Sequence, residues 1–270
     1  MKKNAVLIID PQNSFCNPGD AAGNNRGSLF VEGADKDMKR LAKWIDNNSS
    51  EIDFIGVTLD MHQPNDIAHP SFWQDKQGNF PAPFTVITSK DVENGTWTPR
   101  FDPATCLAYL RELEKQGEFP HVIWPAHCII GSEGAAIYEP LMQSIIKWTE
   151  QGKFFQTVAK GTYPFTEHFG AFHAQIPDPK RPETQLNHNL IKTLEQYQNV
   201  YLAGEAKSHC VANSLKQVLN EAPSLASKFI IIEDCMSNVT GFETLADPIY
   251  EKARKMGVRF TSTASESSLK

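Results

Sequence analysis

Residues 200–215, VYLAGEAKSHCVANSL, pass from a strand-sized run to a helical pattern across one short polar loop. Val200–Ala203 is apolar throughout, whereas Val211, Leu215 and Val218 recur at the spacing of one helix face. A short, wholly apolar run suits a parallel strand that is covered on both faces. The stretch therefore predicts one strand–helix unit of a layered α/β sheet.

The same unit recurs along the chain, and its alternation predicts an α/β fold with a parallel sheet. We expect five apolar strands, at Ala5–Ile9, Phe54–Leu59, Phe154–Val158, Val200–Ala203 and Phe229–Ile232. We expect amphipathic helices at Ala34–Asn47, Pro103–Gln116, Ala136–Gln151, Leu186–Tyr197, Cys210–Asn220 and Glu243–Lys255.

The length and composition fit an ordinary globular protein. The 270 residues are 40% hydrophobic and 21% charged, which is enough to bury a sizeable core. We interpret residues 1–270 as a single domain with an insertion at about 74–121, which is rich in Pro, Gly and aromatic residues and has one clear helix. A long irregular insertion is usually functional or mobile. The Ser- and Thr-rich tail, residues 261–270, is expected to fray.

The net charge of the protein limits its possible partners, and the pattern of its cysteines indicates its location in the cell. A formal net charge of -6 argues against a nucleic-acid partner and against binding to anionic membranes. No stretch approaches the ~18 consecutive apolar residues of a membrane span, and the N-terminus reads as a strand rather than a secretory signal. The 5 cysteines are scattered, without a Cys-x-x-Cys pair, so we expect reduced thiols and a cytoplasmic location.

Reactive residues follow four of the expected strands. Asp10 follows the first strand, Asp60 and His62 the second, Lys160 the third, and Cys210 lies in the loop after the fourth. In open parallel sheets, ligands bind outside the carboxyl ends of the strands. We therefore expect these side chains to meet at one edge of the sheet.

Cys210 is the candidate nucleophile, because a helix N-terminus and a nearby ammonium both lower the pKa of a thiol. Asp10 can accept the thiol proton and return it to a leaving amine. Lys160 can stabilise the thiolate. The alternatives are an inert buried cysteine, a turn aspartate in Asp10-Pro11 and a solvated lysine.

Asp60 and His62 form the pattern of a metal pair, since residues two apart in an extended segment point to the same side. His127 can complete the set, and His69 is a candidate fourth ligand. A carboxylate with imidazoles suits a divalent ion, Zn²⁺ before Fe²⁺ or Mn²⁺. The alternative is chance, because 8 histidines are scattered through the chain.

These motifs resemble the nicotinamidase and isochorismatase-like cysteine hydrolases, in the nicotinamidase (pyrazinamidase) branch. The match is collinear from residue 5 to about residue 260. It rests on residues 5–15 (AVLIIDPQNSF), 60–62 (DMH), 69–72 (HPSF), 124–135 (WPAHCIIGSEGA), 160–161 (KG) and 204–211 (GEAKSHCV).

The resemblance implies a three-layer α/β/α sandwich with a mostly parallel six-stranded sheet. It also implies a triad of Asp10, Lys160 and Cys210. A cis peptide would precede Ala206, and the N–H groups of Ala206 and Cys210 would form an oxyanion hole. Glu205 departs from the small apolar residue that the family usually has before this alanine.

The resemblance further implies one metal ion held by Asp60, His62 and His127, with His69 as a further candidate. The ion would bind the ring nitrogen of the substrate, and Phe15 and Trp124 would sandwich the ring. Ordinary core packing is the alternative for both aromatic side chains. A homo-oligomer is expected from the resemblance alone.

The implied activity is hydrolysis of nicotinamide, a small-molecule amide, to nicotinate and ammonia through a thioester. One alternative is another carboxamide or ureido hydrolase of the same superfamily. A second is an isochorismatase-type vinyl-ether hydrolase, which needs neither an amide nor a cysteine. A third is a ligand-binding module without catalysis, which intact Asp10, Lys160 and Cys210 disfavour.

Overall fold

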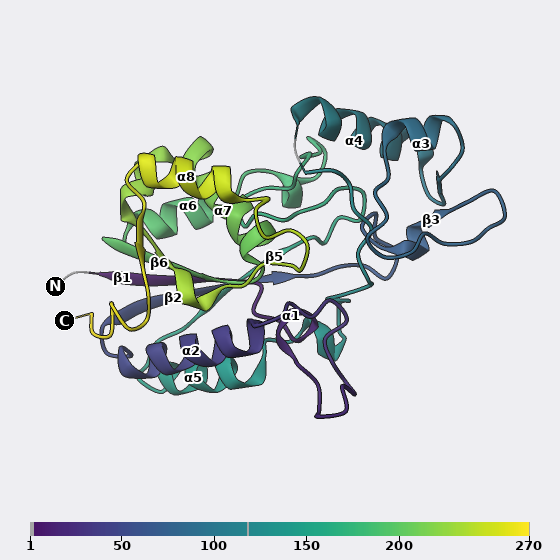
Figure 1. Cartoon of the computed structure of the whole chain (residues 1–270). Helices are drawn as coiled ribbons and strands as arrows, with labels where there is room; N and C mark the ends of the chain where they lie inside the picture. Colours follow the sequence, from purple (N-terminus) through teal and green to yellow (C-terminus); the bar gives the residue numbers. More distant parts are fainter. Residues whose placement is uncertain (1–2, 118, 270) are drawn as a thin grey trace.

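The computed structural model describes residues 3–117 and 119–269, and its centre is a six-stranded sheet (Figure 1). Every strand pair in this sheet is parallel, in the order β5-β2-β1-β6-β7-β8. The strands are β1 (Asn4–Ile9), β2 (Ile52–Asp60), β5 (Gln156–Lys160), β6 (Asn199–Gly204), β7 (Phe229–Ile232) and β8 (Arg259–Thr261).

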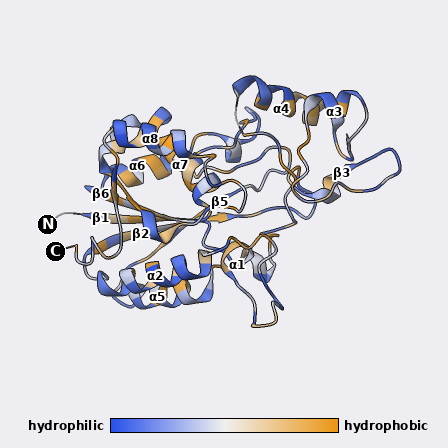
Figure 2. Cartoon of the chain, in the orientation of Figure 1, coloured by the Kyte–Doolittle hydropathy of each residue, from blue (hydrophilic) through white to orange (hydrophobic). Residues whose placement is uncertain are grey.

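Helices cover both faces of the sheet, which confirms the three-layer α/β/α sandwich (Figure 1). One face carries α2 (Ala34–Asn47) and α5 (Glu139–Thr149). The other carries α6 (His188–Glu195), α7 (Ala212–Glu221) and α8 (Asp247–Lys255). Figure 2 shows the hydrophobic strands between helices whose outer sides are hydrophilic.

Strand β1 shows why the central strands are apolar at every position. Val6 and Ile8 belong to the hydrophobic cluster under α2 and α5, whereas Leu7 and Ile9 belong to the cluster under α7 and α8. Alternate side chains of a strand point to opposite faces. A strand between two helical layers therefore needs apolar residues on both sides, as the sequence predicted.

Several element boundaries differ from expectation; α5, α6 and α8, for example, each begin two to four residues later than expected. The expected strand at Phe154–Val158 begins at Gln156, and Phe154 is 88% exposed. Strand β5 lies at the edge of the sheet, so it has a neighbouring strand, β2, on one side only. The expected helix at Cys210–Asn220 begins at Ala212, because a wider π-helical turn, η4 (Lys207–Val211), precedes it.

The expectation that residues 261–270 fray is wrong for the described part of this tail. Strand β8 pairs with β7 and includes Thr261. Beyond it, the Trp44 indole donates to the Glu266 carbonyl at 2.7 Å, and the Leu269 N–H donates to Asn48 at 2.9 Å. These contacts hold the C-terminal segment against α2.

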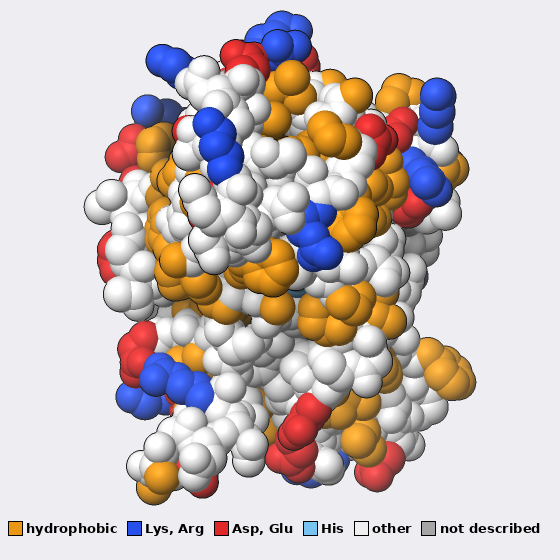
Figure 3. Space-filling view, turned by 90° about the vertical axis from the view of Figure 1, so that its right-hand side faces the viewer, with side chains coloured by type: hydrophobic (Ala, Val, Ile, Leu, Met, Phe, Trp, Pro, Cys, Tyr) orange, Lys and Arg blue, Asp and Glu red, His pale blue; other side chains and the backbone are white. Residues whose placement is uncertain are grey.

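Residues 74–121 carry small elements at the right of Figure 1. Their buried side chains form a third hydrophobic cluster together with Ile67, Phe72, Trp73 and Ile123. Strand β3 (Trp73–Gln74) pairs antiparallel with β4 (Thr98–Pro99). Besides the expected α4 (Pro103–Gln116), the segment forms α3 (Ser89–Glu93), which a Thr88–Asp91 capping box begins. Figure 3 shows hydrophobic side chains gathered on this end of the molecule, where Phe80 and Phe84 are exposed.

The remaining elements are short. They are α1 (Asn13–Cys16) and the turns η1 (Pro70–Phe72), η2 (Glu133–Ala135), η3 (Pro182–Thr184), η5 (Pro223–Lys228) and η6 (Glu233–Cys235). Among the described residues, no helix is both long and apolar enough to cross a membrane.

Candidate active site

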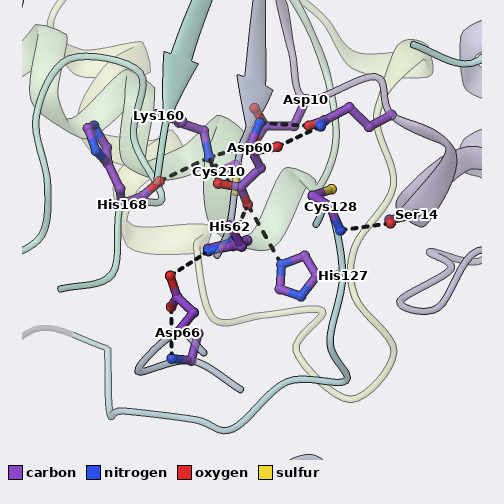
Figure 4. A network of polar contacts seen from close by, with 12 residues as sticks. Asp10, Ser14, Asp60, His62, Asp66, His127, Cys128, Lys160, His168 and Cys210 are labelled. Atoms are coloured by element: carbon purple, nitrogen blue, oxygen red, sulfur yellow. Dashed lines mark hydrogen bonds and ion pairs between the residues drawn. The ribbon is translucent and has the colours of Figure 1, made fainter. Parts of the chain in front are cut away.

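Four neighbouring strands each supply one reactive group at the same edge of the sheet. Lys160 ends β5, Asp60 ends β2, Asp10 follows β1, and the loop after β6 carries Cys210. Figure 4 shows these four side chains pointing toward one another below the strand ends. The spatial order of the strands therefore brings together residues that are up to 200 positions apart in the sequence.

Lys160 is the centre of this cluster, and its side chain is only 1% exposed. Its Nζ lies 2.8 Å from Asp10 Oδ2, 3.1 Å from Asp60 Oδ1 and 3.8 Å from Cys210 Sγ. It also donates to the His168 carbonyl at 2.9 Å. Burial opposes the charge of Lys160, but Asp10 and Asp60 raise its pKa well above the usual value. The lysine is a buried cation held between two carboxylates.

The thiol of Cys210 differs from expectation. Its pKa is raised well above the usual value, first by burial, whereas Lys160 acts in the opposite direction. Burial therefore outweighs the helix N-terminus and the ammonium on which the expected lowering was based. The raised pKa of the Cys210 thiol means that it needs a base, and Asp10, whose Oδ2 contacts Lys160 at 2.8 Å, lies in the same cluster.

Asp10 is held by a residue that sequence reasoning missed. Thr58 Oγ1 donates to Asp10 Oδ1 at 2.6 Å and accepts from Asp10 N at 2.9 Å. Asp10 itself has a positive φ of 43°, which directs its side chain out of the strand. The pKa of Asp10 is raised by burial, and Lys160 partly offsets this effect.

The side chain of Gln12 holds the backbone of Asp60 through two hydrogen bonds, and sequence reasoning gave Gln12 no role. Its Oε1 accepts from Asp60 N and its Nε2 donates to Asp60 O, both at 2.7 Å. The pair of bonds joins the segment after β1 to the last residue of β2. Its only sequence signal was its place two residues after Asp10 in the first motif.

The loop after β6 brings Ala206 beside Cys210, and both line the same cavity. The peptide Glu205–Ala206 is cis, as the resemblance implies. Gly204 has a φ of 122°, and a Cβ there would collide with the Ile9 carbonyl, so only glycine fits. The close approach of β6 to β1 sets where the loop begins.

Three buried histidines lie next to this cluster. One ring nitrogen from each of His62, His69 and His127 lies within 4.8 Å of those from the other two. Asp60 Oδ2 is 3.1 Å from His62 Nε2 and 3.7 Å from His127 Nε2. The expected metal residues, including the further candidate His69, are thus brought together.

The histidine cluster fits a divalent metal ion. Burial lowers the pKa of His127 and lowers that of His69 to about 2, which keeps both imidazoles neutral and able to donate a lone pair. The buried His69 Nδ1 has no hydrogen-bond partner among the described residues. Nitrogen ligands with one carboxylate suit Zn²⁺.

Asp66 adds a contact that sequence reasoning missed. Its Oδ2 lies 3.1 Å from His62 Nδ1, while its Oδ1 accepts from Ala68 N at 3.0 Å. Together, Asp60 and Asp66 raise the pKa of His62 well above the usual value, although burial opposes them. A carboxylate behind a ligating imidazole fixes the orientation of its ring.

A cavity opens onto Cys210 between the sheet edge and aromatic side chains. It encloses about 400 Å³, including its mouth. Phe15 and Trp124, the two expected ring-binding residues, both line it. The other apolar walls come from Leu29, Val31, Phe169 and Val239, and the polar side chains are Asp60, His127, Glu167, His209 and Cys210.

Glu167 is a further lining residue that sequence reasoning missed. It is buried, and its Oε1 has no hydrogen-bond partner in the described ranges. Burial raises its pKa to about 8, so the carboxyl is mostly neutral at pH 7. A neutral acid here can donate a hydrogen bond into the cavity. Its only sequence signal was its position seven residues after Lys160.

Known structures share this fold across nearly the whole chain. No protein-family model and no curated protein matches the sequence. A nicotinamidase/pyrazinamidase from Acinetobacter baumannii superposes with a TM-score of 0.62 at 18% identity, over 98% of both chains. The yeast nicotinamidase bound to the inhibitor nicotinaldehyde gives 0.63 at 17% identity, over 96% of this chain and 99% of that one.

A third structure, the pyrazinamidase of Pyrococcus horikoshii in complex with zinc, gives a TM-score of 0.54 at 15% identity. It covers 96% of this chain and 99% of its own. Proteins described as isochorismatase-family hydrolases have the same fold. The fold that the resemblance implies is therefore confirmed.

Proposed function

We propose that this protein is a metal-containing cysteine amidohydrolase that converts nicotinamide to nicotinate and ammonia. The observation that carries the proposal is the buried contact of Lys160 with Asp10, Asp60 and Cys210, next to three histidines. The structural neighbours described as nicotinamidases support the choice of substrate. Phe15 and Trp124 in the cavity wall suit a flat aromatic ring.

The first half-reaction forms a thioester. Asp10 takes the proton of the Cys210 thiol, and Lys160 stabilises the resulting thiolate. Sγ adds to the amide carbon, and the π electrons move to the oxygen, which the N–H groups of Ala206 and Cys210 bind. When the C–N bond breaks, Asp10 gives its proton to the nitrogen, and ammonia leaves.

The second half-reaction hydrolyses the thioester. Asp10 takes a proton from a water molecule, whose oxygen adds to the thioester carbon. The C–S bond then breaks, nicotinic acid forms, and the proton returns from Asp10 to the sulfur; the acid leaves as nicotinate after it ionises. The sum is one amide and one water converted to one carboxylic acid and one ammonia.

The residues that would hold the metal are Asp60, His62, His69 and His127, and we propose Zn²⁺ as the ion. The zinc complex of the Pyrococcus pyrazinamidase supports this choice. A divalent ion supplies a Lewis acid that can bind the ring nitrogen of a pyridine carboxamide. Asp60 also contacts Lys160, so one carboxylate links the proposed metal site to the triad.

The decisive experiment is Cys210→Ala with an ammonia-release assay on nicotinamide. We expect the variant to lose all measurable turnover and to keep its zinc content, because Cys210 is not among the proposed ligands. Cys106→Ala is the matched control, since Cys106 is a buried thiol in the third hydrophobic cluster, apart from the cavity. Turnover retained in Cys210→Ala would refute the assignment.

Glu167 favours one second candidate, another carboxamide or ureido hydrolase. Glu167 lines the cavity, and its Oε1 has no partner among the described residues, so it can bind a further polar group of a substrate larger than nicotinamide. Comparison of kcat/KM for nicotinamide, pyrazinamide and a set of ureido compounds separates the two candidates. A ureido compound preferred by about 100-fold, or ~2.7 kcal/mol, would favour the second.

A further inference from the structure

A second pair of buried carboxyl groups lies behind the loop that carries Ala206. Glu205, fully buried, directly precedes Ala206, and Asp37 projects from α2. Neither residue lines the cavity that opens onto Cys210. Glu205 also stands where the resemblance leads us to expect a small apolar side chain.

Ser237 forms hydrogen bonds to both carboxyl groups and to the backbone of Lys207, the residue after Ala206. Its N–H donates to Glu205 Oε2 at 3.1 Å, and its hydroxyl donates to Asp37 Oδ2 at 2.5 Å. Its carbonyl accepts from Lys207 N at 2.8 Å. The residues before and after Ala206 are thus both bonded to Ser237, which α2 holds through Asp37.

The charges around the pair indicate which carboxyl carries a proton. Asp37 Oδ1 has a cation, Arg40 Nη2, at 2.8 Å. Glu205 Oε1 has no donor among the residues described, but its carboxyl lies within hydrogen-bonding reach of Asp37. Burial, with Asp37 adding to it, raises the pKa of Glu205 well above the usual value. A proton on Glu205 satisfies both carboxyl groups.

We propose that Glu205 is a positioning residue that holds the Ala206 N–H for the developing oxyanion by donating a hydrogen bond to Asp37 and accepting one from Ser237. The inference rests on the proposed function, because it assigns a role in the same reaction. Glu205 acts through the backbone and does not touch the substrate. An apolar residue at this position could make neither bond.

The proposal predicts an effect on the transition state rather than on substrate binding. The amide oxygen gains charge only when Sγ adds to the carbon, so a misplaced N–H lowers kcat more than it raises KM. Loss of a whole oxyanion donor costs ~10²–10³-fold in rate. A displaced donor should cost less than a lost one, so we expect kcat to fall by at least about 10-fold but by less than ~10³-fold.

The test compares two substitutions of similar size. Glu205→Gln keeps both bonds, since its carbonyl can accept from Ser237 and its amide can donate to Asp37. Glu205→Leu removes both. Glu221→Gln, at an exposed position of α7, is the control. We expect E205Q and E221Q to stay within about threefold of the parent in kcat, and E205L to lose about 10-fold or more with KM nearly unchanged.

A binding measurement makes the test independent of turnover. Cys210 Sγ can add to the carbonyl carbon of nicotinaldehyde. The aldehyde oxygen then carries the negative charge at the position where the amide oxygen would carry it. E205L should bind nicotinaldehyde about 10-fold more weakly and nicotinate equally well, whereas E205Q should bind both like the parent. If the parent releases no ammonia from nicotinamide, the proposed function fails, and the nicotinaldehyde comparison still decides the role of Glu205.

Three results would overturn the role of Glu205. The first is an unchanged kcat and nicotinaldehyde affinity in E205L. The second is a loss in which KM, nicotinate affinity and Tm change together, because that marks a structural role. The third is a loss of kcat and of nicotinaldehyde affinity in E205Q that is as large as the loss in E205L. If E205L does not fold, Asp37→Ala takes its place, because it removes the acceptor for Glu205, and it should lower kcat about 10-fold without changing KM.

Discussion

Thr58 and Asp10 are joined by two reciprocal hydrogen bonds across strands β1 and β2. The hydroxyl accepts from Asp10 N at 2.9 Å and donates to Asp10 Oδ1 at 2.6 Å. With Oδ1 occupied in this way, Oδ2 is the oxygen that meets Lys160 at 2.8 Å. One threonine therefore fixes which carboxylate oxygen of Asp10 faces the ammonium.

Thr58→Val should impair catalysis while the fold remains intact. Valine has a similar shape but no hydroxyl, so Asp10 loses a bond worth ~1.5–3 kcal/mol to a charged group. We expect kcat of ammonia release to fall about 10- to 100-fold. Thr58→Ser, which keeps the hydroxyl, should restore most of the rate. Equal rates in the valine and serine variants would contradict this role.

His69→Ala tests the fourth metal ligand. The ring nitrogens of His69 and His127 lie 3.3 Å apart, so loss of His69 should weaken zinc binding by about 10-fold or more. Competition with a chelating dye measures this affinity without any substrate. His188→Ala, at an exposed position of α6, is the control. An affinity equal to that of the control would remove His69 from the ligand set.

Asp66→Asn tests the residue behind His62. The substitution keeps the shape but removes the carboxylate that lies 3.1 Å from His62 Nδ1. We expect about 10- to 100-fold weaker zinc binding, because partners of this kind orient the ligating ring. The same competition assay applies. Zinc affinity within about twofold of the parent would show that Asp66 does not orient His62.

The metal-free protein should lose stability on acidification, in part through His121. Its Nε2 bonds to the Ile67 carbonyl at 2.9 Å, and its buried Nδ1 has no partner among the described residues. Burial lowers its pKa to about 4, so stability from this group is full above pH 6.5 and is lost as the pH falls toward 4. At pH 5 the loss is about 2 kcal/mol.

His121→Gln should reduce this acid sensitivity. Urea unfolding at pH 7 and pH 5, in the presence of a chelator, measures the change in the free energy of unfolding. That change should be about 2 kcal/mol smaller in His121→Gln than in the parent. His188→Gln, an exposed substitution, should behave like the parent. Identical pH dependence in all three proteins would contradict a neutral buried His121.

The sequence predicted the positions of the reactive groups because each follows an apolar run. Asp10, Asp60 and Lys160 needed only the rule that parallel strands place their carboxyl ends at one edge. Thr58 and Gln12 could not be found in this way. Their partners are 48 residues distant in the sequence, and the contacts depend on the pairing of β1 with β2.

Other differences arose from burial, which composition does not reveal. The Cys210 thiol was expected to have a lowered pKa, but its full burial reverses the direction. Phe154 reads as a strand residue and is exposed, whereas the polar tail near Glu266 packs against Trp44. In each case, the neighbours that decide the outcome come from distant parts of the chain.

The arrangement of β5, β2, β1 and β6 has a consequence for how this protein can evolve. The spacing of adjacent strands, ~4.8 Å, separates the groups at their ends, so the backbone of the sheet sets the distances between them. Loops and helices elsewhere can therefore diverge widely without disturbing the reacting atoms. Sequence drift to 15–18% identity is then compatible with one preserved scaffold.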